Sequence, residues 1–410
     1  MIDLFRSDNV VVRAVPAEDV SRWVVTFDNY GLGPGFDRPG FGEDFLRQSG
    51  VSAIHVLGRS DDWYQYPEMA EAMAAVRQAT QGAARVLTYG SSMGGYAAVR
   101  FADAAGADAA LAISPQYSID PARVPFETRW LQDGKRIAFR PEIEKRLACQ
   151  CRPTIVFDSS SNDDRHARLI ADEIDADLIG LDYVHHPATT YLSEIGLLGG
   201  LVFDALSGTL DVPGFRVEAT ARRRNSAVYL SRLSEMQPAC RLGLAKRLAM
   251  RAVDRAPHSP LALTSLAHCL GRMEEHDQAI ALYAQATELG QRSANYLVPY
   301  ANGLIAAGRL EEALDLAVEA VEELPAAAHL RYWLGTIFSR LGRGEEAAAA
   351  LEAAVALDPH QPVYRQLLEE CRPRLDESPE GLKFSHILRF VRRRISAPDL
   401  DAGRRRRSAF

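Results

Sequence analysis

Cysteine is scarce in this sequence of 410 residues. There are five cysteines, and a small, odd number argues against a disulfide framework and for a reducing compartment. Cys149 and Cys151 are separated by one residue, so they lack the C-x-x-C spacing, and no further Cys or His pair lies near them at ligand spacing. We therefore interpret them as ordinary thiols and expect no metal site.

Long apolar runs are missing as well. No segment approaches the length needed to span a bilayer, and residues 1–6 lack the pattern of a signal peptide. With 47% hydrophobic and 25% charged residues, the composition is typical of a globular protein. These observations predict a cytoplasmic protein of two or three domains.

Positive charge is in deficit over most of the chain. The net charge is −7, although residues 376–410 carry nine Lys or Arg and only five Asp or Glu. The remainder is therefore at −11, which excludes nucleic acid from the expected partners. The segment 376–410 is basic and amphipathic, and two interpretations stay open: peripheral contact with an anionic membrane at its inner face, or a terminal helix that caps the preceding helices.

The most informative stretch is residues 85–97. An apolar run rich in strand-forming residues meets Gly90-x-Ser92-x-Gly94, and a helix-forming run follows. Such a sharp turn strains the backbone of its middle residue, so the positions two before and two after it need hydrogen in place of a side chain. Ser92 would then project above a sheet, and the Met93 amide would point to where a negative oxygen can develop.

The surrounding pattern alternates short apolar runs with helical segments. This alternation predicts a mostly parallel, doubly wound α/β sheet, closed by a helix over 188–206. The glycine-rich segment 29–42 opens no helix at the dinucleotide-binding spacing, so we read it as a long loop and expect no cofactor. The expected strands cover residues 9–15, 22–28, 51–57, 85–91, 109–114, 154–158 and 176–183.

A serine nucleophile needs an imidazole to take its proton and a carboxylate to orient that imidazole. Acids follow the strand at 154–158: Asp163 is favoured, Asp164 is second, and Asp158 also competes. Histidines follow the strand at 176–183, where His185 and His186 are adjacent. We favour His186, which directly precedes a proline on the approach to the closing helix.

The elbow and the order Ser92, Asp163, His186 make residues 1–207 resemble a compact α/β-hydrolase domain. The resemblance implies a serine hydrolase that uses Ser92, Asp163 and His186 as its triad. It also implies a second oxyanion amide, beside that of Met93, from the loop after a central strand, near Asn29 or Tyr30.

Two other segments are candidates for substrate contact. Trp63 and Tyr64 lie in a loop at the carboxyl end of a strand, where a substrate-binding rim belongs, although packing of that loop is an equal alternative. Residues 115–145 interrupt the alternating pattern with prolines, charges and aromatics. They are interpreted either as a lid or as a cover for one sheet edge.

The second half repeats with a period of 34 residues. Small residues recur at this spacing in two series, Ala279, Ala313 and Ala347, and Ala267, Ala301 and Gly335. Pro325 and Pro359 stop helices at the same register. The pattern resembles tetratricopeptide repeats over 226–375, an all-α solenoid of helix pairs preceded by a linker at 208–225. The tryptophan position of the repeat is occupied by Leu263, Leu297 and Arg331.

The resemblance implies a groove that binds a peptide or protein partner, unless the array only packs on its own chain or on a second copy. Together the two halves predict a serine esterase or thioesterase brought to a partner by its repeats, acting on a small ester or an acylated glycan or lipid. The alternatives are a catalytically degenerate adaptor and an acyltransferase that uses the same triad.

Overall fold

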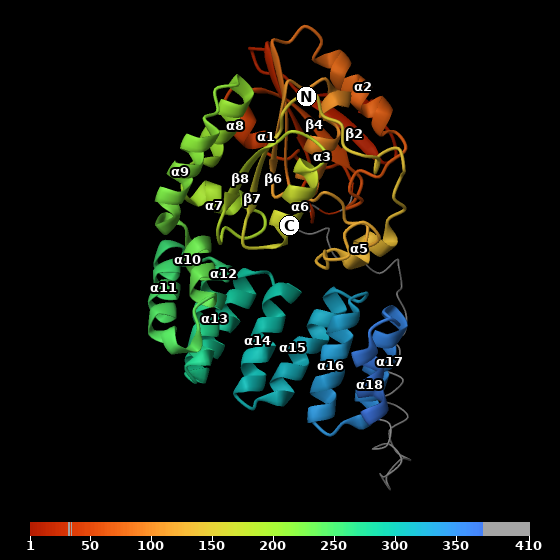
Figure 1. Ribbon diagram of the computed structural model, residues 1–410. Coiled ribbons are helices and arrows are strands. Elements are labelled where there is room, and N and C mark those ends of the chain that lie inside the picture. Colours follow the sequence, from red (N-terminus) through yellow and green to blue (C-terminus); the bar gives the residue numbers. More distant parts are fainter. Residues whose placement is uncertain (32, 34, 372–410) are drawn as a thin grey trace. The chain divides into compact units, whose positions relative to one another are not determined.

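The computed structural model describes residues 1–31, 33 and 35–371, and the chain divides into two units between Leu233 and Ser234 (Figure 1). The basic segment 376–410 lies outside the described residues, so its two interpretations stay predictions. The boundary differs from the expected one. Residues 212–222, predicted to be linker, form helix α9 (Val212–Arg222), which packs on the last strand of the first unit and buries Phe215 and Ala219.

The described part of the first unit is built on one eight-stranded sheet with the order β1-β2-β4-β3-β5-β6-β7-β8. Strands β3 to β8 run parallel, whereas β2 is antiparallel to both β1 and β4. The prediction of a mostly parallel sheet is thus confirmed, and only β1 was not expected. The strands are β1 (Ile2–Arg6), β2 (Val10–Val15), β3 (Arg22–Phe27), β4 (Ser52–Gly58), β5 (Arg85–Ser91), β6 (Ala109–Ile113), β7 (Thr154–Asp158) and β8 (Asp177–Leu181).

Helices and loops connect these strands. The single helix expected over 188–206 is two helices, because Gly196 adopts φ +71° between them and breaks the helical path. The helices are α1 (Glu43–Gln48), α2 (Met69–Ala79), α3 (Met93–Arg100), α4 (Ala102–Ala105), α5 (Leu131–Arg136), α6 (Asn162–Ala171), α7 (Thr189–Glu194) and α8 (Leu198–Ser207).

The order of the strands creates a switch point in the middle of the sheet. β4 lies on one side of β3 and β5 on the other, so the chain reverses its direction of winding between them. The loops that leave the carboxyl ends of β3 and β5 therefore diverge, and ligands of open α/β sheets bind in the crevice between such loops. Ser92 lies here, immediately after β5.

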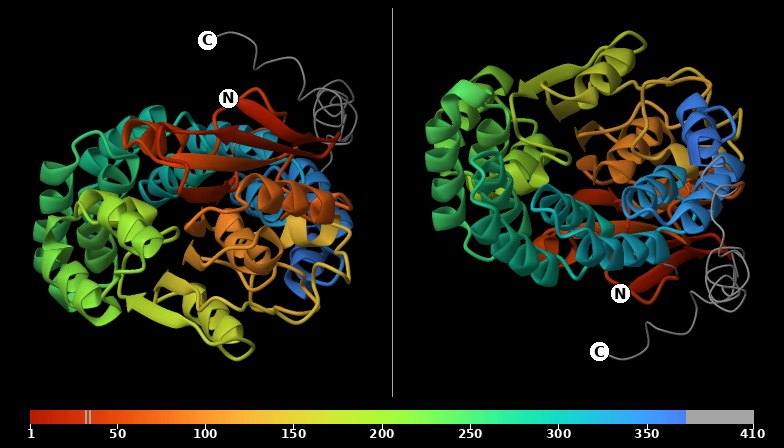
Figure 2. Two further views of the ribbon diagram at one scale, coloured as in Figure 1. Left: turned by 90° about the horizontal axis from the view of Figure 1, so that it is seen from above. Right: turned by 90° about the horizontal axis from the view of Figure 1, so that it is seen from below.

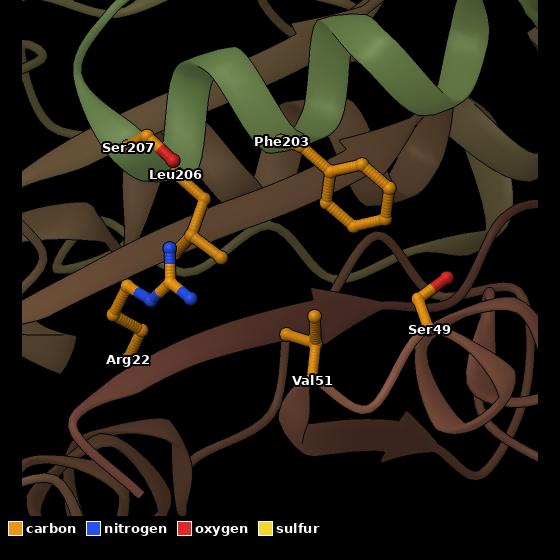
Figure 3. A pocket seen from close by; sticks show the side chains of 6 residues that line it. All are labelled: Arg22, Ser49, Val51, Phe203, Leu206 and Ser207. Carbon is orange, nitrogen blue, oxygen red and sulfur yellow. The ribbon is translucent and has the colours of Figure 1, made fainter. Parts of the chain in front are cut away.

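A hollow of about 230 Å³ lies at the opposite edge of the sheet (Figure 3). Arg22 opens β3, Val51 directly precedes β4, and Leu206 lies near the end of α8, so the hollow belongs to the amino ends of the parallel strands. It is remote from the carboxyl ends where the serine lies.

The second unit is a curved row of antiparallel helices that stack in chain order (Figures 1 and 2). Helix α10 (Ala227–Glu235) crosses the boundary between the units. The following helices are α11 (Leu242–Arg255), α12 (Pro260–Arg272), α13 (His276–Leu289), α14 (Ala294–Ala306), α15 (Leu310–Glu323), α16 (Ala328–Arg340), α17 (Gly344–Leu357) and α18 (Pro362–Cys371).

Small residues lie where paired helices cross, as the 34-residue spacing predicted. The alanines of both series are at most 2% exposed, and a Cβ on Gly335 would lie 2.7 Å from Cγ of Leu351. At the position that the repeat pattern gives to tryptophan, Leu263 and Leu297 are buried, and Arg331 is buried too. The guanidinium of Arg331 donates to the Pro325 carbonyl at 2.9–3.0 Å, so it ties α16 to the end of α15.

Candidate active site

Ser92 occupies a strained turn between β5 and α3. Its φ is 54° and its ψ is −118°, a region that non-glycine residues rarely adopt. Its amide donates to the Ile113 carbonyl at 2.8 Å, which anchors the turn to β6. A Cβ on Gly90 would lie 2.2 Å from the Gly94 oxygen, and one on Gly94 would lie 2.4 Å from the Phe27 oxygen. Both glycines are therefore required by close backbone approach.

The structure brings together the three residues that the sequence selected. Ser92 Oγ lies 2.8 Å from His186 Nε2, and His186 Nδ1 lies 2.8 Å from Asp163 Oδ2. Because the carboxylate accepts at Nδ1, that nitrogen carries the proton of the neutral ring, and Nε2 presents a lone pair to the serine hydroxyl. The arrangement has the geometry of a nucleophile, a base and an orienting acid.

Asp163 lies in the first turn of α6, where Ser161 caps the helix by accepting from the Asp163 amide at 3.2 Å. The side chain of Asp163 is 1% exposed. Burial by itself raises the pKa of its carboxyl, but the hydrogen bond from His186 and the charge of Arg129 outweigh burial and hold the pKa below its ordinary value. The carboxylate is therefore ionised at neutral pH.

The two competing acids have structural partners. Asp158 is buried, and its carboxylate accepts from the amides of Ser160, Tyr183 and His185 at 2.7–3.2 Å. It therefore fixes the turn that carries His186 without touching the imidazole. Asp164 points to the surface, where Arg168 donates to it at 2.7 Å along the same helix.

His185 likewise has a local role. The amide of His186 donates to His185 Nδ1 at 2.7 Å, so the His185 ring folds back on the backbone of the turn. The residue itself adopts φ +66°. This conformation, held by Asp158, leaves His186 as the histidine in contact with Ser92.

The amides expected to bind an oxyanion lie on two elements. Met93 is the first residue of α3, so its N–H has no partner within the helix. In the loop after β3, the Asp28 amide donates to the hydroxyl of Tyr64, and the Gly31 amide donates to Asp61 at 2.9 Å. The amides of Asn29 and Tyr30 lie between these two occupied groups and stay the candidates for the second donor.

The two aromatics proposed for a substrate rim differ in role. Tyr64 is 1% exposed, packs edge-on against Phe27, and donates to the Val56 carbonyl. The prediction that it lines a substrate-binding rim is therefore wrong, because Tyr64 belongs to the core. Trp63 is fully buried as well, but it lies close to the site through Gln116. Both side chains are buried because their loop packs against the sheet, and the sequence alone does not show this packing.

Gln116 is a site residue that the sequence reasoning missed. It is 1% exposed, and its Nε2 donates to Ser92 Oγ at 3.3 Å. The indole nitrogen of Trp63 can only donate, and it donates to Oε1 of Gln116 at 3.1 Å. The indole therefore fixes the amide with its NH₂ group toward the serine. The one sequence feature that could have indicated Gln116 is its position shortly after a strand, which is also the feature that indicated the candidate acids.

Trp130 was missed too. Its ring meets the His186 ring edge-on at a centroid distance of 5.1 Å and packs against Trp63 at 5.7 Å. Tyr30, which is 41% exposed, lies against both tryptophans. These side chains form an aromatic wall over the imidazole.

The segment 115–145 supplies Gln116 and Trp130 and is fixed to the body of the first unit. The buried carboxylate of Glu144 accepts from Tyr96 of α3 at 2.7 Å, and within the segment it also binds Ser118 at 3.0 Å and pairs with Arg123. Arg100 of α3 also donates to the Ile143 carbonyl at 2.6 Å. Of the two interpretations, these bonds favour a fixed cover over a lid.

Several other expectations concern chemistry elsewhere in the chain. Cys149 and Cys151 are free thiols whose sulfur atoms lie 3.2 Å apart. Within residues 1–31, 33 and 35–371, no group of three His, Cys, Asp or Glu side chains is arranged to hold a metal ion. No helix of the described part is both long and apolar enough to cross a membrane.

Comparison with protein families identifies the repeats of the second unit. Two family models, each described as tetratricopeptide repeat, match residues 304–371 and 261–289. The C-terminal region therefore contains tetratricopeptide repeats, as the spacing predicted. A comparison with curated proteins gives no significant match.

Solved structures similar to the chain include a MamA fragment and two proteins described as TPR proteins. A fragment of MamA from Desulfovibrio magneticus RS-1 is 21% identical, with 37% of this chain and 85% of that chain covered and a TM-score of 0.32. TTC0263, a thermophilic TPR protein in Thermus thermophilus, is 17% identical over 45% of this chain and 99% of that one, with a TM-score of 0.34. YrrB, a TPR protein with an unusual peptide-binding site, is 18% identical over 44% and 90%, with a TM-score of 0.32.

Proposed function

We propose that the first unit is a serine hydrolase that cleaves a carboxylic ester or thioester. The observation that carries the proposal is the continuous hydrogen-bonded series from Ser92 Oγ through His186 to Asp163, with both links at 2.8 Å. The strained backbone of Ser92 adds support, because strain in a buried turn persists where the surrounding structure enforces it.

In the proposed reaction, Ser92 Oγ attacks the carbonyl carbon while His186 Nε2 takes the hydroxyl proton. Asp163 holds the ring and stabilises its charged form. The amide of Met93, with that of Asn29 or Tyr30, donates to the oxygen on which negative charge develops. His186 then returns the proton to the leaving alcohol or thiol, and a water molecule releases the acyl group by the same steps.

For the second unit, we propose that the tetratricopeptide repeats bind a peptide or protein partner and bring the hydrolase to it. The acylated substrate would then be a small ester or an acylated glycan or lipid close to that partner. Pull-down with the full-length Ser92→Ala protein, which would retain a bound substrate, tests this part of the proposal.

The hydrolase proposal is tested with a fluorophosphonate probe and p-nitrophenyl acetate. We expect the full-length protein to be labelled and to turn over the ester, and Ser92→Ala to lose labelling and at least about 1,000-fold in kcat/KM. Ser91→Ala, which changes the buried neighbouring serine of β5, is the matched control and should keep both. Absence of labelling and of Ser92-dependent turnover would favour the adaptor alternative.

An acyltransferase would use the same triad with a different acceptor. Adding a primary alcohol or a thiol during turnover separates the two activities, because a hydrolase releases mainly the free acid whereas a transferase forms the new ester or thioester. The products are measured by mass spectrometry.

A further inference from the structure

The carboxylate of Asp163 has a positive neighbour as well as a histidine. Its Oδ1 lies 2.8 Å from Nη2 of Arg129, while its Oδ2 faces His186. A cation at this distance weakens the negative potential that the carboxylate exerts on the imidazole, and burial enlarges this effect. Arg129 alone would therefore make it harder for His186 to take a proton.

Glu127 binds the same guanidinium, through Nε and through the Nη2 atom that also lies beside Asp163. Its Oε1 accepts from Arg129 Nε at 3.0 Å, and its Oε2 accepts from Nη2 at 2.6 Å. Glu127 is 3% exposed. Burial raises the pKa of this carboxyl, but hydrogen bonds from His166 and Arg129 outweigh burial and lower the pKa to about 2. Glu127 is thus a fixed negative charge.

His166 completes the cluster as a neutral group. The amide of Tyr117 donates to His166 Nδ1 at 3.2 Å, so this nitrogen presents a lone pair. Nε2 therefore carries the proton and donates to Glu127 Oε2 at 3.0 Å. The ring is fully buried. Asp163, Arg129, Glu127 and His166 together carry a net charge of one negative unit.

We propose that Glu127 is a positioning residue which neutralises Arg129, so that the Asp163 carboxylate acts on His186 with its full negative charge. Arg129 holds Oδ1 of Asp163 in place and stacks on Trp130 at 4.5 Å, and Glu127 removes the electrostatic penalty of that contact. The catalytic meaning rests on the proposed hydrolase function. The charge balance itself is measurable without any substrate.

Other groups face His186 from the elements packed around it. Ser92 is neutral, and Trp130 contributes the edge of an uncharged ring. His185 and Asp158 belong to the turn that carries His186, and Asp158 accepts from the His185 amide at 2.7 Å. Contacts link Glu127 to His186 through Arg129 and Asp163, and the charge of Glu127 also acts on the imidazole through space.

The test is an NMR titration of His186 in the full-length protein with labelled histidine, its signal among the ten histidines being assigned by its loss in His186→Gln. Glu127→Gln should lower the pKa of His186 by about one unit, because Arg129 is then uncompensated. Glu127→Asp should keep the wild-type pKa. The double variant Glu127→Gln/Arg129→Met removes both charges and should restore it.

Asp164→Asn is the matched control, since it removes a partly exposed carboxylate next to Asp163 in sequence and should shift the pKa much less. An unchanged pKa in Glu127→Gln, or a lowered one that the double variant fails to restore, would overturn the inference. If ester turnover is found, the acid limb of its pH profile should shift with the NMR value. If none is found, the hydrolase proposal fails while the titration still decides the role of Glu127.

Discussion

The two units bury different kinds of side chain. In the first, ionisable groups lie in the interior close to the carboxyl ends of the strands, among them Asp28, Glu127, Asp158, Asp163 and His166. In the described part of the second, the interior is mostly Ala and Leu, and the buried charged side chains are Arg331 and Asp358. Because a buried charge is costly unless it is paired, a protein retains many of them where they act together. The first unit therefore buries the charged groups on which the proposed hydrolase function depends, whereas the interior of the second unit serves mainly to pack its helices.

Glycine substitutions should give the largest difference in stability between the two units. We expect Gly94→Ala to destabilise the first unit by about 3 kcal/mol or more, because the new Cβ would meet the backbone oxygen of Phe27 at 2.4 Å. Gly335→Ala in the second unit meets Cγ of the buried Leu351 side chain at 2.7 Å, not backbone, and it gains helix propensity, so the cost should be smaller, about 1 to 2 kcal/mol. Differential scanning calorimetry measures both. Equal effects would break the comparison.

Lowering the pH should destabilise the first unit through the buried His55 of β4. This ring is 1% exposed and hydrogen-bonds Thr26, and burial lowers its pKa to about 4 from an ordinary value of 6.5. The unfolded chain therefore binds the proton first, and the stability that neutral His55 provides above pH 6.5 is lost as the pH falls toward 4.

The magnitude of this loss is about 3 kcal/mol. We expect the stability of wild type relative to His55→Gln to fall by that amount between about pH 7 and pH 4 in denaturant titrations. A pH-independent difference between the two proteins would contradict the assignment of a neutral buried ring.

The smallest expected effect concerns the indole that orients Gln116. Trp63→Phe keeps an aromatic ring in the core but removes the donor to Oε1, so the Gln116 amide can turn its oxygen toward Ser92. Loss of one neutral hydrogen bond corresponds to about a tenfold fall in kcat, with KM unchanged. Gln116→Leu in the Trp63→Phe background should add little, and a large additional loss would refute the coupling.

Local patterns were enough for much of the fold. The strand, turn and helix around Ser92 were readable because the required glycines leave a local trace, and the 34-residue period of Ala279, Ala313 and Ala347 survives the loss of tryptophan from the repeat. The order of strands and loops along the chain also indicated Asp163 and His186, which the structure places in contact with each other. Their catalytic roles stay predictions.

The features that could not be predicted from the sequence depend on contacts between distant segments. Glu127, Arg129 and Trp130 come from the segment 115–145, which has no periodicity, and only its folding over the strand ends brings them to Asp163 and His186. Tyr64 was placed at a rim because aromatic composition does not distinguish a loop that faces solvent from one that plugs the core. The helix α9 was missed because nothing local shows that it covers β8.

That helix sets where the molecule can be divided for experiment. The carbonyl of Ala219 in α9 accepts from the buried hydroxyl of Tyr191, and the adjoining Ser226 hydroxyl bonds to Glu194 of α7. A fragment ending at residue 207 would leave the Tyr191 hydroxyl without its acceptor and would remove the helix that packs on the edge strand β8. Uncovered edge strands invite association with other chains. A fragment ending at residue 233 retains both the acceptor and the helix. Any fusion of this unit to another domain would therefore have to include α9.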